Sequence, residues 1–371
     1  MMQVKIKRAG ATISRLFKKS PTSTVGLDIS SGAIKIAEVC WIQGQPELVA
    51  ADIEELSTNT VRDGYVLNKE KLTETLERAW ALRGVKGKHV VLSLSGQAVL
   101  IRELLFPAMN DEELRQAVKW ELDKYISTPD AANYYFDFAV LGTAKDMQNI
   151  RVLLVAAPLE MISGLIRAVK QAGLKPLAID IEPLALQRTM EKANNAIIID
   201  IGAGCCQLNL FQQGSPLVSR FIPLSGGRFT EAIGKVLVLD FYEAEKLKKQ
   251  HKGLLSKSSQ SGKVPTAVHQ SLNLLVGELA REIRRTIDYY QMQNRDAFID
   301  KVVLTGGGAQ LDNLADNLST LLAGTQVLIH SPLTFLQISP SLSIERLQEV
   351  ELQIAVAIGL ALRRSDEKNG D

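Results

Sequence analysis

Two short segments of the chain, residues 28–35 and 200–204, place an aspartate at the end of an apolar run and follow it with small residues. An aspartate at a strand end can hold a hydrated divalent cation, and Ser or Gly after it lets backbone N–H groups approach phosphate oxygens. Lys35 adds a positive charge beside the first aspartate. The two segments together indicate loops that face one bound phosphate chain.

A third segment, residues 302–311, is an apolar strand pattern that ends in three glycines and precedes a helical pattern. Consecutive glycines allow a flat ligand to approach the backbone closely. Each loop alone is a weak signal, because an apolar strand that ends in a glycine turn is common in α/β proteins. The ordered set of three carries more information than any single loop.

This ordered set resembles the actin-like ATPase superfamily, which includes actin, heat-shock chaperone ATPases, sugar kinases and FtsA, and the resemblance spans residues 24 to about 362. It implies an α/β fold with two α/β halves around a nucleotide cleft that binds ATP and Mg²⁺. The aspartates of both phosphate loops would hold the metal through water. The matching residues are Asp28, Ser31, Gly32 and Lys35 in the first phosphate loop, Asp200, Gly202 and Gly204 in the second, and Gly306, Gly307 and Gly308 in the adenosine loop.

Glu182, which precedes Pro183, resembles a family residue in the segment that connects the two phosphate-side subdomains. The resemblance implies that its carboxylate orients the attacking water, directly or through one more water. The alternative is structural, because an acid and a proline in the first turn of a helix are favoured without any ligand. Sequence leaves both interpretations open.

Residues 244–249 resemble the family helix that lays a Glu and a Lys along the ribose and adenine, which would assign Glu245 and Lys248 to nucleoside contacts. A solvated helix face of mixed charge is the more common structure for such a run. Its position between the second and third loops favours the nucleotide interpretation.

The second phosphate loop departs from the family pattern, because Ala203, Cys205 and Cys206 stand where actin has a further acid and a hydroxyl residue. A small apolar residue removes one contact to a Mg²⁺-bound water and leaves the backbone cradle intact. We therefore expect phosphate binding with slow hydrolysis.

The chain has 371 residues, which exceeds the usual size of a single core and predicts two domains or two similar halves. Its 46% hydrophobic and 23% charged residues are ordinary for a globular protein, and a net charge of +2 predicts no nucleic-acid partner. Three cysteines and four scattered histidines form no disulfide framework or metal-ligand spacing, which favours a reducing cytosol and implies no metalloenzyme. They are Cys40, Cys205, Cys206, His89, His251, His269 and His330.

No run reaches the roughly 18 apolar residues of a membrane span, and the start lacks a signal-peptide block, so we expect a cytoplasmic chain. The first 23 residues are basic and carry no acid. A short amphipathic helix on anionic lipid would gain about 1 kcal/mol per basic residue, and the alternative is a disordered leader. The basic residues are Lys5, Lys7, Arg8, Arg15, Lys18 and Lys19, with Ile6, Ile13, Leu16 and Phe17 between them.

The remaining chain shows alternating strand and helix patterns. A helix at 275–290 has an apolar stripe at four-residue spacing, and the small residues of a helix at 352–362 favour close packing across the two halves. The polar, Ser-rich segment 256–265 is expected to be mobile. Strands are predicted at 25–29, 34–36, 47–53, 90–94, 98–101, 196–201, 207–212, 217–224 and 302–305.

From residue 107 the pattern becomes helix, strand, strand, helix, which indicates a small inserted α+β module. Its position and pattern resemble subdomain IC of the FtsA and PilM families. The predicted boundaries are a flexible basic leader at 1–23, subdomain IA at 24–106 and 180–195, inserted subdomain IC at 107–179, subdomain IIA at 196–225 and 301–371, and subdomain IIB at 226–300 with a mobile loop at 253–266.

Within the superfamily, the segment 15–21 before the first loop, the helix 282–290 and the lack of a membrane anchor are most similar to the PilM family of type IV pilus systems. The resemblance implies a cytoplasmic ATP-binding protein at the inner face of the bacterial inner membrane, where the nucleotide is regulatory. Its partner would be the cytoplasmic tail of a PilN-type inner-membrane protein, held near subdomain IC within the pilus assembly complex. Peripheral membrane association and homo-oligomerisation stay open.

Two other functions stay open. An FtsA-like division protein would polymerise on membrane, but that family usually ends in an amphipathic anchor, whereas residues 365–371 are polar. A sugar or acetate kinase would need a catalytic aspartate in a substrate cleft, and the sequence has no clear substrate motif.

Overall fold

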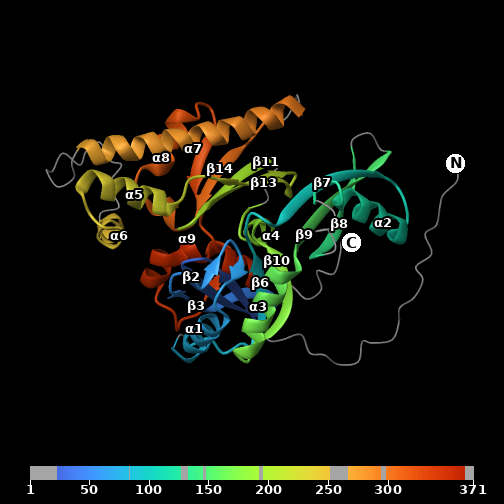
Figure 1. Cartoon of the computed structure of the whole chain (residues 1–371), viewed down its shortest axis with the longest axis horizontal. Helices are drawn as coiled ribbons and strands as arrows, with labels where there is room; N and C mark the ends of the chain where they lie inside the picture. Colours follow the sequence, from blue (N-terminus) through green and yellow to red (C-terminus); the bar gives the residue numbers. More distant parts are fainter. Residues whose placement is uncertain are drawn as a thin grey trace.

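The computed structural model describes residues 23–82, 84–126, 133–144, 148–191, 195–250, 266–293 and 298–363. It consists of two α/β halves and a smaller α+β unit that projects to one side (Figure 1), which confirms the predicted fold class. Residues 1–22 of the predicted leader, residues 253–265 of the predicted mobile loop and the polar tail from residue 364 lie outside the described residues.

The first half is built on a six-stranded sheet with an antiparallel meander at one side and parallel strands at the other. In spatial order its strands are β10 (Lys175–Ile181), β6 (His89–Leu94), β1 (Ser23–Ile29), β2 (Ala33–Ile42), β3 (Gln45–Glu55) and β16 (Gln337–Ile338). Side chains alternate between its two faces. One face packs on α1 (Lys69–Leu82) and α3 (Leu159–Gln171), and the other on α9 (Ile344–Ala361).

A small hairpin leaves the first half between β3 and α1. It pairs β4 (Val61–Arg62) with β5 (Tyr65–Val66) through a turn in which Asp63 and Gly64 both have positive φ. An Asp-Gly pair with this geometry makes the tight turn that suits the twist of two antiparallel strands.

The second half is built on a five-stranded sheet. In spatial order its strands are β13 (Ser215–Ile222), β12 (Cys206–Gln212), β11 (Asn195–Ile201), β14 (Lys301–Thr305) and β15 (Gln326–Ile329). Its outer core contains α5 (Gly226–Leu237), α6 (Phe241–Gln250), α7 (Thr266–Gln293), α8 (Leu314–Leu321) and the short 3-10 helix η3 (Gly307–Gln310). The predicted stripe of α7 is confirmed, because Leu275, Leu279, Ile283 and Tyr290 are buried in this core.

The two sheets share a central helical layer formed by α4 (Glu182–Arg188) and α9. Its apolar cluster joins Val91 of the first sheet to Ile198 of the second. The two helices approach so closely that small residues are required, because a Cβ on Gly359 would overlap the backbone of Ala185. The predicted close packing of this helix across the two halves is confirmed.

The projecting unit is a three-stranded antiparallel sheet covered by one helix. Its helix, α2 (Asp111–Leu122), begins with a capping box between Asn110 and Glu113, as its acidic first turn predicts. The strands, in spatial order, are β7 (Leu100–Pro107), β9 (Asn149–Pro158) and β8 (Tyr134–Thr143).

Two segments lie in a different layer from the predicted subdomains. The predicted insert, 107–179, contains α3 and β10, but Met161 and Leu165 of α3 pack in the first-half core and β10 pairs with β6. Likewise, β16 and α9 pack on the first sheet, although the prediction placed 301–371 in the second half. Periodicity identifies a buried face but does not say which core covers it.

Candidate functional site

A cleft of about 580 Å³ lies between the two halves and is lined by residues of both. The three predicted loops, which are far apart in sequence, meet there. The predicted residues that line it are Ser31, Gly32, Lys35, Glu182, Asp200, Gly202, Gly204, Glu245, Lys248, Gly306, Gly307 and Gly308. Of the predicted set, only Asp28 is not on its surface.

The two predicted phosphate loops face each other across the cleft. A Cβ on Gly204 would lie 3.0 Å from Ser31 Oγ, and a Cβ on Gly32 would lie 3.9 Å from Ala203 Cβ. At this separation, backbone groups of both loops can contact one ligand. Glycine keeps this space open, because any larger residue would fill it.

Asp28 lies beneath the cleft and has only 1% of its surface exposed. Its carboxylate accepts hydrogen bonds from Lys35 Nζ and Ser93 Oγ, both at 2.7 Å. The antiparallel register of β1 and β2 places Asp28 opposite Lys35. Asp28 thus positions the Lys35 ammonium, and its contact with Mg²⁺ through water stays a prediction.

Lys35, Asp200 and Glu182 form the charged floor of the cleft. Burial, followed by the negative charges of Asp28 and Asp200, raises the pKa of Glu182 to about 8. Burial also raises the pKa of Asp200 to about 6, although Lys35 opposes this shift. Burial acts to lower the pKa of Lys35, but the surrounding carboxylates outweigh it and raise that pKa. At neutral pH Glu182 is therefore mostly protonated, and the carboxylates of Asp200 and of Asp28 beneath the floor together outnumber the single Lys35 ammonium.

Glu182 has the helix position of the structural interpretation and also lies in the cleft, and its role in orienting water stays a prediction. It begins α4 with Pro183 in the first turn, and its carboxyl group lines the cleft. The Ser95 hydroxyl also donates a hydrogen bond to it. Helix position and cleft position are thus properties of the same residue.

The charged floor fits a hydrated divalent cation. The described residues contain no group of three or more acidic, histidine or cysteine side chains that could hold a metal ion by themselves. Mg²⁺, however, keeps several waters and commonly binds one or two carboxylates together with phosphate. The positive charge of a cation beside Asp200 and Glu182 would favour their charged forms and so oppose the burial and repulsion that raise their pKa values. The donor set therefore fits Mg²⁺ held through water.

The three glycines of the third loop have different surroundings. A Cβ on Gly306 would overlap the Asp200 carboxylate, and one on Gly308 would overlap the Ile201 side chain. A Cβ on Gly307 would instead lie 3.5 Å from the Gln353 side chain, in ordinary contact. Gly306 and Gly308 are thus required by close packing on β11, and only Gly307 leaves space for a ligand.

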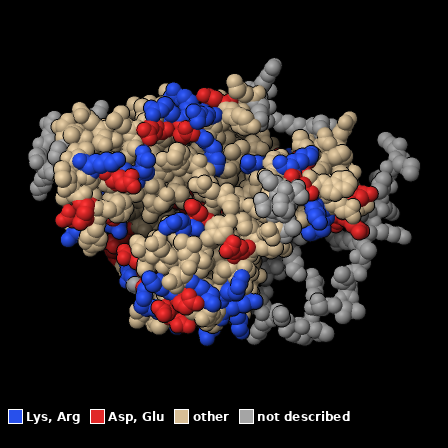
Figure 2. All heavy atoms as spheres, viewed as in Figure 1, with Lys and Arg blue, Asp and Glu red and all other residues tan. Residues whose placement is uncertain are grey.

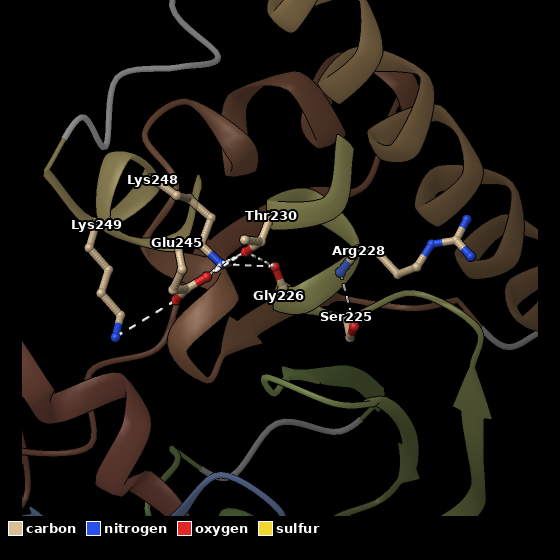
Figure 3. Close-up of polar contacts among 7 residues, drawn as sticks. All are labelled: Ser225, Gly226, Arg228, Thr230, Glu245, Lys248 and Lys249. Atoms are coloured by element: carbon tan, nitrogen blue, oxygen red, sulfur yellow. Dashed lines mark hydrogen bonds and ion pairs between the residues drawn. The ribbon is translucent and has the colours of Figure 1, made fainter. Parts of the chain in front are cut away.

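A polar network ties helices α5 and α6 together at the end of the cleft where the sequence predicts the nucleoside, called here the nucleoside end (Figure 3). Lys248 Nζ donates to the carbonyl oxygen of Gly226 at 2.8 Å and to Thr230 Oγ1 at 2.7 Å, and it pairs with Glu245 Oε2 at 2.6 Å. These partners use all three donors of the ammonium group. Lys249 lies farther from Glu245, at 3.8 Å.

The network lowers the pKa of Glu245. Burial acts in the opposite direction and is the largest single effect, but the bonds from Lys248 and Thr230 together outweigh it. The pKa of Lys248 is also lowered, because burial outweighs the attraction of Glu245. Glu245 and Lys248 thus line the cleft and bind each other. Both side chains are half-buried, whereas the alternative interpretation expected a solvated helix face.

Several cleft residues lay outside the sequence-based prediction. Gly226 and Gly227 follow the helix N-cap Ser225, and their N–H groups donate to the carbonyl oxygens of Gly202 and Ala203. A glycine turn after an apolar strand was the available signal, the same one that identified the three loops. Other missed residues, which no local motif marks, include Arg62, Asp63, Ser95, Gly96, Phe241 and Lys249.

Cys205 lines the cleft directly after the second phosphate loop. Cys205 is exposed at the cleft surface, but loss of solvation within the cleft, followed by the charges of Glu182 and Asp200, raises the pKa of its thiol to about 12. The thiol is therefore protonated at neutral pH and is a poor nucleophile. Cys205 therefore adds an uncharged side chain to the cleft wall.

A second cavity of about 360 Å³ lies beside the first, between the projecting unit and the second sheet. Tyr125 and Tyr134 line it from the projecting unit, and Ser219 lines it from β13. The two cavities share four lining residues: Ser95, Gly96, Gln207 and Phe221. A ligand in either cavity would therefore contact the wall of the other.

On the face shown in Figure 2, basic and acidic side chains are intermixed over both halves and over the projecting unit. Such mixing produces no extended field of one sign on that face. Within the part of the chain that the structure describes, no helix combines the length and hydropathy required to cross a bilayer.

Comparison with known proteins gives matches over most of the chain. A curated relative, the cell division protein FtsA of Pseudomonas aeruginosa, is 25% identical over 270 residues, which cover 65% of this chain and 64% of that protein. FtsA of Bacillus subtilis is 34% identical over 114 residues, which cover 29% of this chain and 26% of that protein. The matched stretch thus spans less than two thirds of either relative.

Solved structures give fuller coverage. The PilM-PilN type IV pilus biogenesis complex contains a chain that is 29% identical, with a TM-score of 0.79 over 92% of this chain and 98% of that one. The ethanolamine utilization protein EutJ of Carboxydothermus hydrogenoformans has 16% identity and a TM-score of 0.56, over 92% of this chain and 90% of that one. The latter likeness concerns the fold alone.

The model of the family described as type IV pilus assembly protein PilM matches residues 26–365. This range contains all three glycine loops, both sheets and the projecting unit. The fold is that of the actin-like ATPases, and the chain belongs to the PilM family of type IV pilus assembly proteins.

Proposed function

We propose that this protein is an ATP-binding adaptor of a type IV pilus assembly complex, in which Mg-ATP occupies the cleft between the halves. The observation that carries the proposal is the meeting of three glycine loops from both halves at one cavity with a buried acidic floor. The two facing loops would hold the phosphates, Asp200 the hydrated Mg²⁺ with Asp28 behind it, and the loop after β14 the adenosine.

Turnover in this cleft would be slow. Glu182 is the residue proposed to orient the attacking water, and a cation bound beside it would return part of its carboxyl group to the charged form. Hydrolysis would be slow because Ala203, which stands where actin has a further acid, supplies no polar contact to a Mg²⁺-bound water. ATP would therefore act mainly as a regulatory ligand that favours closure of the two halves.

The second cavity is the proposed site for the cytoplasmic tail of a PilN-type inner-membrane protein. It is bounded by the projecting unit, which the family resemblance associates with this partner, and its size suits a few side chains of an extended peptide. The tail would hold the chain at the inner face of the membrane. Because the cavities share a wall, each ligand should change the affinity for the other.

Isothermal titration tests the proposal. The purified protein is titrated with Mg-ATP, then with a synthetic peptide of the PilN-type tail from the same genome, and then with each in the presence of the other. Binding of both with equal reciprocal coupling is expected. Absence of ATP binding would overturn the nucleotide site, and absence of peptide binding would overturn the partner assignment.

An FtsA-like function is the second candidate, because the curated relatives carry that name. It predicts filaments on lipid. Sedimentation with ATP on anionic liposomes separates the two: lipid-bound filaments without any peptide affinity would favour the FtsA-like function.

A further inference from the structure

The cations that line the cleft are mostly bound to carboxylates already. Lys35 pairs with Asp28 at 2.7 Å. Lys248 and Lys249 both pair with Glu245, at 2.6 and 3.8 Å. Lys35 and Lys248 therefore bring little uncompensated positive charge to a ligand, whereas Lys249 is exposed and shares the Glu245 carboxylate with Lys248.

Arg62 is the exception among the cleft-lining cations that the structure describes, because no carboxylate lies within ion-pair distance of it. One of its terminal nitrogens, NH2, donates to Asn59 Oδ1 at 2.6 Å, which fixes the direction of the side chain. A guanidinium group has five N–H donors in a planar fork, so the others are available to a ligand.

The turn of the β4–β5 hairpin, which directly follows Arg62, lies close to the charged floor. A Cβ on Gly64 would overlap the carbonyl oxygen of Ser95, and a Cβ on Gly96 would overlap that of Asp63. The turn is therefore packed directly on the Ser95–Gly96 backbone. Ser95 in turn donates to Glu182, so the hairpin lies one residue from the floor.

A nucleoside triphosphate brings more negative charge into this cleft than a diphosphate does, and the floor is already acidic. Mg²⁺ and Lys35 offset part of this charge. The additional phosphate of the triphosphate requires a further cation, and a guanidinium fork binds two phosphate oxygens at once. Arg62 is the side chain of the cleft with that capacity.

We propose that Arg62 binds the terminal phosphate and is the residue by which this cleft distinguishes a nucleoside triphosphate from a diphosphate. The inference rests on the proposed nucleotide site and names a residue that none of the three glycine loops contains. Because Ser95 and Gly96 also line the second cavity, the hairpin that carries Arg62 contacts the wall between the two sites.

The test compares the affinities for Mg-ADP and for the Mg²⁺ complex of a non-hydrolysable ATP analogue by isothermal titration. In Arg62→Ala, we expect the affinity for the analogue to fall by about tenfold or more, with a much smaller change for ADP. Arg62→Lys, which keeps the charge but loses the fork, should give an intermediate ratio. Lys249→Ala, which changes a cation elsewhere in the cleft, should leave the ratio of the two affinities as in the unaltered protein.

Two results would overturn the inference and leave the nucleotide site standing: an unaltered protein that binds both nucleotides equally, or an Arg62→Ala variant that keeps the original ratio. Failure of the unaltered protein to bind either nucleotide would overturn the inference together with the nucleotide site. Thermal unfolding of each variant shows whether the fold is intact, and Arg62 is exposed, so we expect no loss of stability.

Discussion

The two ends of the cleft differ in whether their charged side chains are balanced by partners in the protein. At the end where the phosphates are proposed to bind, Asp28 and Glu182 are buried, Asp200 and Lys35 are half-buried, and the carboxyl groups outnumber the ammonium group. At the nucleoside end, Glu245 and Lys248 are paired and share polar partners on α5. One end is left with uncompensated negative charge, whereas the other is balanced within the protein.

This difference separates a binding function from a structural one. Buried like charges destabilise the protein until a cation arrives, so their presence at one end is explained by a ligand that supplies positive charge. A satisfied network needs no ligand and fixes two helices relative to each other. We therefore expect changes at the phosphate end to alter metal and nucleotide binding, and changes at the nucleoside end to alter stability.

The largest expected effect comes from Asp200→Asn. Loss of the carboxylate should weaken Mg-ATP binding by about 100-fold, or ~2.7 kcal/mol, because the negative charge that binds the hydrated cation through water is lost. The same change should raise the thermal unfolding temperature without ligand, since it removes one of the repelling buried charges. Titration calorimetry and thermal unfolding measure the two effects.

A fall in both affinity and stability would indicate that Asp200 is a structural residue, and it would remove the contrast between the two ends. Asp63→Asn is a suitable control, because this carboxylate also lines the cleft but is exposed. We expect it to leave the unfolding temperature unchanged.

The next effect is a loss of stability with rising pH. The folded-state pKa of Glu182, about 8, lies above its ordinary value of 4.5, so the folded state holds this proton longer than the unfolded chain does. The contribution of protonated Glu182 to the free energy of unfolding is complete below pH 4.5 and is lost as the pH rises toward 8. Between pH 6.5 and 8 the ligand-free protein should lose about 2 kcal/mol of unfolding free energy.

The buried His330 does not contribute to the change of stability in this pH window. Burial lowers the pKa of His330 to about 4, so its contribution to stability increases between pH 4 and 6.5 and opposes the carboxyl groups there. Asp200, with a pKa of about 6, changes mostly below the window. The groups that face Glu182 are Asp28, Lys35, Ser95 and Asp200. Denaturant titrations at several pH values should show the fall, and Glu182→Gln should abolish it; a flat profile in the unaltered protein contradicts the buried acidic floor.

The sequence predicted that the three loops meet at one cleft, because the signal of each loop is local. An aspartate or glycine at a strand end appears in a few consecutive residues, and all three loops were found in that way. Which partner neutralises a side chain depends on distant segments, so the burial of Asp28 beneath the cleft and the isolation of Arg62 could not be predicted. The same limit explains the misplaced α3 and α9, whose apolar faces pack against strands distant in sequence.

The third loop allows a smaller and more local comparison. Gly308→Ala places a Cβ against Ile201, and overpacking of this kind usually costs 1–3 kcal/mol, partly offset by the reduced freedom of the unfolded chain. We expect a net loss of about 1.5 kcal/mol in chemical denaturation. Gly307→Ala has room for its Cβ and should keep stability while reducing nucleotide affinity. Equal stability of both variants would show that the loop packs less tightly on β11.

The smallest expected effect is at the nucleoside end, where Lys248→Met should lower the unfolding free energy by about 1 kcal/mol. The change leaves Glu245, Thr230 and the Gly226 carbonyl without their shared donor, and Glu245 keeps a charge in a half-buried position. Lys249→Met is the matched control, because its 3.8 Å pair with Glu245 is exposed and such pairs contribute close to zero.

Denaturant unfolding of Lys248→Met, Lys249→Met and the double variant Lys248→Met/Glu245→Gln measures this network without any ligand. If its function is to join α5 to α6, the double variant should recover part of the loss, since no unpaired charge remains. Nucleotide affinity should change little in Lys249→Met and modestly in Lys248→Met, through the position of the α5 N-terminus. A large loss of affinity in Lys248→Met with unchanged stability would instead mean that the ammonium leaves its partners to bind the nucleotide, and the two ends of the cleft would then both bind ligand through charge.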